Sequence, residues 1–527
     1  MPSTSKPCGC FVRNRSGAVI ASPVLWPLAA GLGAFFGYAN PAWHFPLLAL
    51  VLPAALSTFG RAAQTSRQAF ALCWRIGSVA SIACLYWVYW PVMHYGEVNW
   101  ILALPVPVLL AMAMGCYHGL FGVAACLSNR LSPLLAMVFL GLAWTSMELA
   151  QATLLSGFSW LTLASAFAPW TIVVQAASVM GAYGVSGVLA AIAAGAVLGV
   201  RAKACLALST ALTIALLAFG WQRMDNDAET TPAHTVAVVQ GNIDQSIKWD
   251  PAYQMDTVRK YVRLSRDIAA SASPELIVWP ETSMPFYFQD DTPMREPAAA
   301  FARTGKAALL IGAPAYERTS GPQSFVLYNR AFLLTSGEAS QTWYDKEHLV
   351  PFGEYMPLAG LLPLQKLVSG VGDFVPGRNE HPLKVNGLAL GVLICYEAIF
   401  ADLAQERVAQ GANVLVNISN DAWFGDTSAP HQHLRLASLR AIEQGRHMVR
   451  STNTGISAFI DPLGRVRQVG PQFAELAAAG VVHPRNDNTL FHNVYGWLLA
   501  GLGAAMAVFA VLIFRGVPRP GQTSGLR

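Results

Sequence analysis

One cysteine lies where a nucleophile would be well placed. Residues 388–395 form an apolar run that stops at the thiol of Cys395, and Tyr396 and Glu397 follow directly. A continuous apolar run of this length predicts a buried strand, so the thiol would lie on a rigid edge. Cys395 is the only cysteine after Trp221 and has no disulfide partner in that region. Most lone cysteines are small hydrophobic core residues, so other residues must decide its role.

Two more side chains complete a reactive set. Residues 276–281 form an apolar run that ends on Glu281, and Lys346 lies in the sequence Trp-Tyr-Asp-Lys-Glu-His. A carboxylate can take the thiol proton and so generate the attacking thiolate. A lysine can stabilise the oxyanion of a tetrahedral intermediate, with the backbone N–H after the cysteine as second donor. The alternative is a surface glutamate, a surface lysine and a buried cysteine that never meet.

Strand and helix signals alternate in residues 222–493. The pair Asp250-Pro251 is typical of a helix start, with an Asp N-cap and Pro at the first helical position. That helix is predicted to reach about residue 270, and a second is predicted over about 431–448. Alternation with continuous apolar strands predicts a sheet covered by helices. The predicted strands are 235–243, 276–281, 308–315, 328–334, 388–395, 414–419 and 455–460.

The rest of the chain has the composition of membrane helices. Of 527 residues, 54% are hydrophobic and 12% charged, about half the charged fraction of a soluble protein. Runs of about 20 apolar residues can cross a bilayer. Eight are predicted, at 18–38, 43–60, 70–90, 99–126, 132–153, 172–200, 204–221 and 494–514. The expected domains are a tail (1–16), seven helices (17–221), a catalytic domain (222–493), a last helix (494–514) and a second tail (515–527).

Basic residues predict the orientation of these helices. They occur only in alternate connections, at Arg13, Arg15, Arg61, Arg67, Arg130, Arg201, Lys203, Arg515 and Arg519. The connections 40–43, 91–100 and 156–170 have no Lys or Arg. Because basic loops stay in the cytoplasm, both termini are predicted to be cytoplasmic. The catalytic domain would then lie in the periplasm, on the outer side of a bacterial inner membrane. The net charge of +5 thus reports orientation, and we expect no nucleic-acid partner.

Four ordered motifs resemble the nitrilase superfamily. They are Trp-Pro-Glu-Thr (279–282), Tyr-Asp-Lys-Glu-His-Leu-Val-Pro-Phe-Gly-Glu-Tyr-Met-Pro (344–357), Ile-Cys-Tyr-Glu (394–397) and Asn-Ile-Ser-Asn-Asp-Ala-Trp-Phe-Gly (417–425). With eight spans around them, they resemble the apolipoprotein N-acyltransferases in particular. The resemblance implies an αββα sandwich attached to a multi-span helical membrane domain. It also implies a triad of Glu281 as general base, Lys346 as oxyanion stabiliser and Cys395 as nucleophile.

The resemblance also implies a reaction. An acyl chain would pass from a phospholipid, usually phosphatidylethanolamine, to Cys395 as a thioester. The α-amino group of an N-terminal diacylglyceryl-cysteine on a bacterial lipoprotein would then attack the thioester. This is ping-pong acyl transfer, the last step of lipoprotein maturation. No cofactor is expected.

Several further residues are candidates around the triad. The resemblance implies supporting roles for Glu354, Tyr396 and Glu397. It also suggests that Trp249 and Trp423 lie around the lipid pocket, although each is equally well explained as core packing. The pair His431 and His433 offers too few ligands for a metal site, so no metal is expected.

Two features connect the chain to lipid. Glu148 is the one acidic residue inside an apolar run; an intramembrane carboxylate is a functional candidate by default, here for lipid contact, and otherwise a helix-end residue near the headgroups. The largely apolar segment 355–374 contains Gly360, Gly370 and Gly372. It is predicted to be a mobile lid, with an ordinary buried loop as the alternative.

Two other functions use the same features. A membrane-anchored nitrilase-type amidase would hydrolyse a small C–N substrate with the same triad, but one anchoring helix would suffice for it. A transporter with a degenerate outer domain would need more polar residues in its spans. The intact triad motifs also argue against the transporter.

Overall fold

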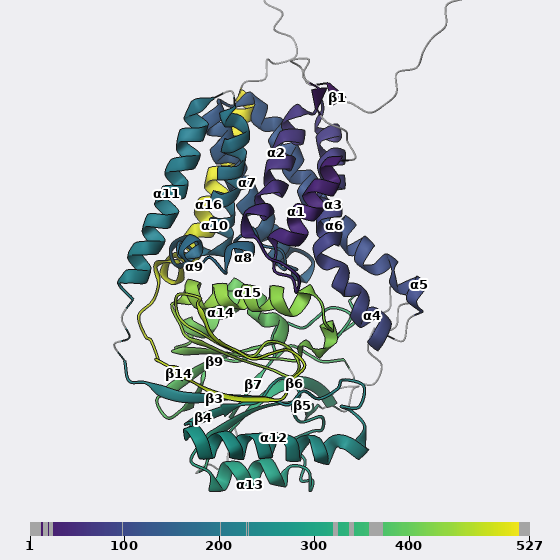
Figure 1. The fold of residues 1–527 in the computed structure, drawn as a ribbon, viewed down its shortest axis with the longest axis vertical. Helices are drawn as coiled ribbons and strands as arrows, with labels where there is room; N and C mark the ends of the chain where they lie inside the picture. Colours follow the sequence, from purple (N-terminus) through teal and green to yellow (C-terminus); the bar gives the residue numbers. More distant parts are fainter. Residues whose placement is uncertain are drawn as a thin grey trace, which may run out of the picture.

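A bundle of apolar helices stands on an α/β domain (Figure 1). The computed structural model describes residues 12–13, 19–20, 25–96, 99–200, 202–227, 229, 231–319, 325–336, 342–357 and 373–515. The short strand β1 (Val12–Arg13) and the end of helix α16 (Leu490–Arg515) lie at the end of the bundle away from the α/β domain (Figure 1). The fold class predicted from the sequence is confirmed.

Each of the eight predicted spans corresponds to an apolar helix. They are α1 (Leu25–Gly37), α2 (Val51–Ala62), α3 (Ser66–Leu85), α6 (Pro105–Leu127), α7 (Pro133–Thr153), α10 (Ala177–Gly199), α11 (Lys203–Asp225) and α16. Within the described ranges, six helical stretches are long and apolar enough to cross a membrane. The first two spans match shorter apolar helices, Leu25–Gly37 and Pro46–Ala62.

Short helices occupy the connections on the side of the α/β domain. They are α4 (Tyr89–Tyr95), α5 (Trp100–Ala103), α8 (Leu163–Phe167) and α9 (Thr171–Val174). The predicted spans 99–126 and 172–200 include α5 and most of α9, and the sequence indicated only that the connections 91–100 and 156–170 lack basic residues. Helices of four to seven residues are too short to leave a periodic signal.

The α/β domain is built from two six-stranded sheets that pack face to face. The first has the order β14-β3-β4-β5-β6-β7 and the second the order β13-β12-β11-β10-β9-β8. The strands of the first are β3 (His234–Gln240), β4 (Leu276–Val278), β5 (Ala308–Arg318), β6 (Phe325–Leu334), β7 (Thr342–Asp345) and β14 (Leu476–Val482). Those of the second are β8 (Leu383–Val385), β9 (Leu388–Ile394), β10 (Val414–Ser419), β11 (Met448–Thr452), β12 (Ala458–Ile460) and β13 (Val466–Val469).

Helices cover both outer faces of this sandwich. Helices α12 (Pro251–Ala272) and α13 (Glu296–Thr304) cover the face away from the bundle, and α14 (Ala401–Ala409) and α15 (Ser428–Gln444) cover the face toward it (Figure 1). The predicted start of α12 is confirmed, because the Asp250 side chain accepts a hydrogen bond from the Ala252 N–H. The result is the predicted αββα arrangement.

The helix predicted over 431–448 is wrong at both ends. It starts at Ser428, where the side chain of Thr427 caps it by accepting from the Ala429 N–H. It ends at Gln444, because Gly445 adopts a φ of +63°, the left-handed conformation that commonly terminates helices. Met448 is instead the first residue of β11.

Helix α15 is buried on two sides. Leu434 and Ala441 pack in the apolar cluster beneath the second sheet. Leu439 and Ile442 belong to the core of the helical bundle. One helix therefore joins the two parts of the molecule.

Candidate active site

Cys395 lies at a sharp change in backbone direction. It follows β9 directly and begins the short 3₁₀ turn Cys395–Ile399. Its φ is +52°, a conformation that costs a non-glycine residue roughly 1–3 kcal/mol and clusters at functional sites. The strained backbone conformation thus occurs at the residue that the sequence predicts as the nucleophile.

Glu281 and Lys346 meet in the same buried region. The Lys346 Nζ lies 3.7 Å from Glu281 Oε1 and 2.8 Å from Glu354 Oε2. The side chain of Asn329 donates to both carboxylates, at 2.7 Å to Glu281 and 2.8 Å to Glu354. The Asn420 N–H donates to the other oxygen of Glu281 at 2.9 Å. Both carboxylates are therefore held by fixed donors around one ammonium group.

The charges of this cluster act on the thiol. Burial raises the pKa of Cys395 well above its usual range, Glu281 raises it further and Lys346 partly offsets this rise. The resting thiol therefore keeps its proton and needs a base to remove it. Burial alone would lower the pKa of Lys346, but Glu354 and Glu281 outweigh it and raise that pKa. The ammonium group therefore stays charged.

The Glu397 side chain bonds both the loop that follows Lys346 and the end of the strand that precedes Cys395. Its Oε1 accepts from the Tyr344 hydroxyl (3.0 Å) and from the N–H groups of Glu347 (2.7 Å) and His348 (3.1 Å). Its Oε2 accepts from the Ile394 N–H at 2.6 Å. One carboxylate thus links the loop that carries Lys346 to the end of the strand that carries Cys395.

The sequence of the chain matches two family models. These are the apolipoprotein N-acyltransferase N-terminal domain, over residues 30–195, and the carbon-nitrogen hydrolase, over residues 235–482. The chain is 36% identical over 486 residues to the apolipoprotein N-acyltransferase of Geobacter metallireducens, covering 89% of this chain and 91% of that protein. The chain belongs to the apolipoprotein N-acyltransferase family.

A second relative agrees with this assignment. The apolipoprotein N-acyltransferase of Nitrosomonas europaea is 31% identical over 495 residues, which cover 92% of this chain and 97% of that protein. Among solved structures, Saccharomyces cerevisiae Nit3, of the nitrilase superfamily, is 17% identical, with a TM-score of 0.38 over 51% of this chain and 96% of that chain.

In this apolipoprotein N-acyltransferase family member, the other predicted site residues lie in different places. Glu354 joins the cluster through Lys346. Tyr396 turns toward the bundle, and its hydroxyl donates to the Gly157 carbonyl at 2.9 Å. Trp423 is half-buried, its ring 4.8 Å from that of Tyr95 in an edge-on contact.

The remaining predicted residues differ in their exposure. Trp249 is partly exposed, at 36% of its surface. Glu148 is only 1% exposed and bonds inside the protein, so this conformation presents no carboxylate to lipid. Most of the predicted lid, residues 358–372, lies outside the described residues.

Sequence reasoning missed two polar residues beside Glu281. Asn329 reaches it from β6, and the Nζ of Lys248 lies 3.5 Å from its backbone oxygen. Burial lowers the pKa of Lys248 to about 7, although Glu281 opposes this shift. The one sequence signal for Lys248 was its position next to Trp249, which was already a candidate site residue.

The histidine considered as a metal ligand has other partners. The Nε2 of His433 lies 3.0 Å from the Cys395 carbonyl oxygen, and its Nδ1 lies 3.2 Å from Asp421. Arg450 donates to the same aspartate at 2.7 Å. In the described part of the chain, no group of His, Cys, Asp or Glu is arranged to hold a metal ion.

Glu397 predicts a pH dependence of stability. Burial raises its pKa from 4.5 to about 7, so the folded protein binds this proton more tightly than the unfolded chain. The group's contribution to the free energy of unfolding is therefore largest below pH 4.5, falls as the pH rises to about 7 and is constant above. We expect the melting temperature of the wild type, minus that of Glu397→Gln, to fall over this window. A difference that does not change with pH would contradict the assignment.

Proposed function

We propose that this chain moves an acyl chain from a membrane phospholipid, through a thioester on Cys395, to the N-terminal amine of a diacylglyceryl-cysteine on a lipoprotein. The observation that carries the proposal is the buried cluster of Lys346 between Glu281 and Glu354 beside Cys395. This cluster belongs to a domain that shares helix α15 with a membrane bundle. A water-soluble amide substrate would not require that attachment.

In the first half-reaction, the sulfur of Cys395 attacks the ester carbonyl of the phospholipid. Glu281 takes the thiol proton as the C–S bond forms. Lys346 and the N–H of Tyr396 stabilise the oxyanion. The ester C–O bond then breaks, and the proton passes from Glu281 to the departing alcohol oxygen of the lysophospholipid.

In the second half-reaction, the lipoprotein amine attacks the thioester carbonyl. Glu281 accepts the amine proton as the C–N bond forms, and the same donors hold the oxyanion. The C–S bond breaks, and the sulfur regains a proton. The new amide leaves with its lipoprotein, and the enzyme returns to its starting state.

The surroundings of Trp423 support access from lipid. Its ring contacts Tyr95 at the end of α4, and the neighbouring α5 exposes Trp100 and Leu102 at 57% and 68%. Such exposed apolar and aromatic groups suit the boundary of a bilayer. We place this end of the bundle, and the catalytic domain, on the periplasmic side, with both termini in the cytoplasm.

Intact-protein mass spectrometry tests the donor. We expect purified protein incubated with phosphatidylethanolamine to gain the mass of one acyl group, which hydroxylamine removes. A diacylglyceryl-cysteine peptide should then discharge the adduct and gain the same mass. The matched control is the ether-linked analogue of the phospholipid, which has no ester carbonyl and should give no adduct.

Two outcomes would refute this function. The absence of an adduct with a reactive Cys395 would indicate the small-substrate amidase instead. An adduct that water discharges as fast as the peptide does would indicate a lipid hydrolase.

A further inference from the structure

A loop from the bundle lies against Tyr396, the residue that follows the nucleophile. Residues 157–163 connect α7 to α8 and make three hydrogen bonds to the catalytic domain. The Gly157 carbonyl accepts from the Tyr396 hydroxyl at 2.9 Å, and the Ser159 hydroxyl donates to the Ile399 carbonyl at 3.3 Å. The Trp160 indole donates to the Gln432 side chain at 2.7 Å.

The loop also packs on two neighbours of the Cys395 carbonyl group, Tyr396 and His433. The Trp160 ring is stacked 6.3 Å from Tyr396 and tilted 5.4 Å from His433. The Nε2 of His433 lies 3.0 Å from the Cys395 oxygen. The peptide between Cys395 and Tyr396, whose N–H is the second oxyanion donor in the proposed mechanism, is thus bordered by groups that touch Trp160.

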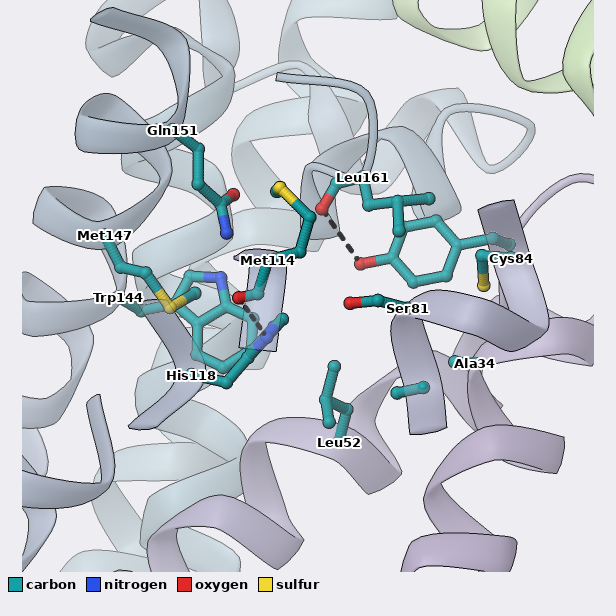
Figure 2. A pocket seen from close by; sticks show the side chains of 12 residues that line it. Ala34, Leu52, Ser81, Cys84, Met114, His118, Trp144, Met147, Gln151 and Leu161 are labelled. Carbon is teal, nitrogen blue, oxygen red and sulfur yellow. Dashed lines mark hydrogen bonds between the residues drawn. The ribbon is translucent and has the colours of Figure 1, made fainter. Parts of the chain in front are cut away.

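Glu148 holds this loop from inside the bundle. Its Oε1 accepts from the Leu163 N–H at 2.7 Å and from the Trp144 indole at 2.8 Å. A second bond to the loop runs from the Tyr38 hydroxyl to the Leu161 carbonyl at 3.3 Å. Trp144 and Leu161 both line a small cavity between the helices, and the bond to Leu161 crosses one side of it (Figure 2).

A carboxylate is an expensive group to bury at this depth. Glu148 is 1% exposed, and removing a carboxyl group from water is unfavourable unless hydrogen bonds compensate. An apolar residue would pack among these helices without that cost. The carboxylate holds the Trp144 indole and, through the Leu163 N–H, the loop that precedes Leu163.

We propose that Glu148 is a positioning residue for the reaction. Through loop 157–163 it keeps Trp160 against Tyr396 and His433, and so fixes the oxyanion-binding peptide after Cys395. The inference rests on the proposed function, because that function assigns the peptide its role. Both half-reactions form an oxyanion at the same place, so loss of Glu148 should slow both by a similar factor.

The test compares Glu148→Ala, Glu148→Gln and the control Ser146→Ala, whose hydroxyl bonds only its own helix at Leu142. Single-turnover rates are measured separately for thioester formation from phosphatidylethanolamine and for transfer to a diacylglyceryl-cysteine peptide. We expect Glu148→Ala to slow both about 10- to 100-fold, with unchanged apparent KM for both substrates, because small misplacements near reacting groups cost this much. Glu148→Gln keeps the accepting oxygen and should stay within about threefold of the wild type, since hydrogen bonds to that oxygen hold the loop and the charge does not.

Melting temperatures of all variants report folding. If Glu148→Ala does not fold, Tyr38→Phe carries the test, because it removes the other bond to the loop. It should slow both half-reactions equally, by a smaller factor. A raised KM for phospholipid with normal transfer would overturn the inference in favour of lipid contact, and so would a Gln variant as slow as the Ala variant. Normal rates in Glu148→Ala would overturn this inference alone, whereas a wild type that forms no thioester would overturn the proposed function.

Discussion

Replacing Cys395 with alanine is expected to abolish acyl transfer. No other group in the cluster can form the thioester, so both half-reactions stop together. Loss of a nucleophile in comparable enzymes costs about 10⁶-fold in kcat, so the residual rate should fall below detection, by more than about 10⁴-fold. The measurement is the transfer of a labelled acyl chain from phosphatidylethanolamine to a diacylglyceryl-cysteine peptide, with the acyl adduct followed in the same sample.

The described cysteines offer a matched control. Cys116 is free and exposed on α6, so Cys116→Ala should keep both the adduct and the transfer rate. Melting temperatures of both variants should stay close to that of the wild type. Transfer without an adduct in Cys395→Ala would mean direct attack of the amine on the phospholipid.

Glu281→Gln is expected to lower the rate of thioester formation about 10²- to 10⁴-fold, the range that general bases contribute. The reason is the raised pKa of the Cys395 thiol, which leaves little thiolate to attack without a base. Glutamine keeps a similar shape between Asn329 and Asn420 but accepts no proton. Single-turnover acylation, followed by mass, measures the effect.

A surface glutamate supplies the control for this substitution. Glu296 is exposed and pairs only with Arg303 at 2.5 Å among the ion pairs described, so Glu296→Gln should leave acylation unchanged. If Glu281→Gln acylates at the wild-type rate, Glu281 is not the base. Glu354, whose Oε2 lies 2.8 Å from Lys346, would then be the next carboxylate to test.

The sequence predicted those site residues that local pattern marks. Cys395 and Glu281 follow apolar runs, and the motifs around them place Lys346 in the same family pattern. Asn329 was not predicted, because it lies on β6 and reaches Glu281 only through the pairing of strands in the folded sheet. No local sequence pattern shows that pairing. Contacts of this kind depend on the tertiary fold.

Prediction from the sequence has a similar limit in the membrane helices. Hydropathy located α7 and placed Glu148 within it, but it did not predict the rotation of the helix, which turns the carboxylate toward Leu163 and away from lipid. The second helix was predicted to run to residue 448, whereas the left-handed backbone of Gly445 ends α15 at Gln444. Burial on two sides removes the amphipathic pattern from which such boundaries are usually read.

Because α15 is buried on two sides, its packing depends on the order in which the chain is synthesised. Gln432 bonds the indoles of Trp87 and Trp160 in the bundle, and Glu443 accepts from the Ala182 N–H where Gly181 interrupts α10. The last helix, α16, contacts both α10 and α15, yet it is the last of these to leave the ribosome. The packing around α15 is therefore complete only after α16 has been made. We expect a catalytic domain expressed alone to aggregate, because the side of α15 that packs in the bundle would be exposed.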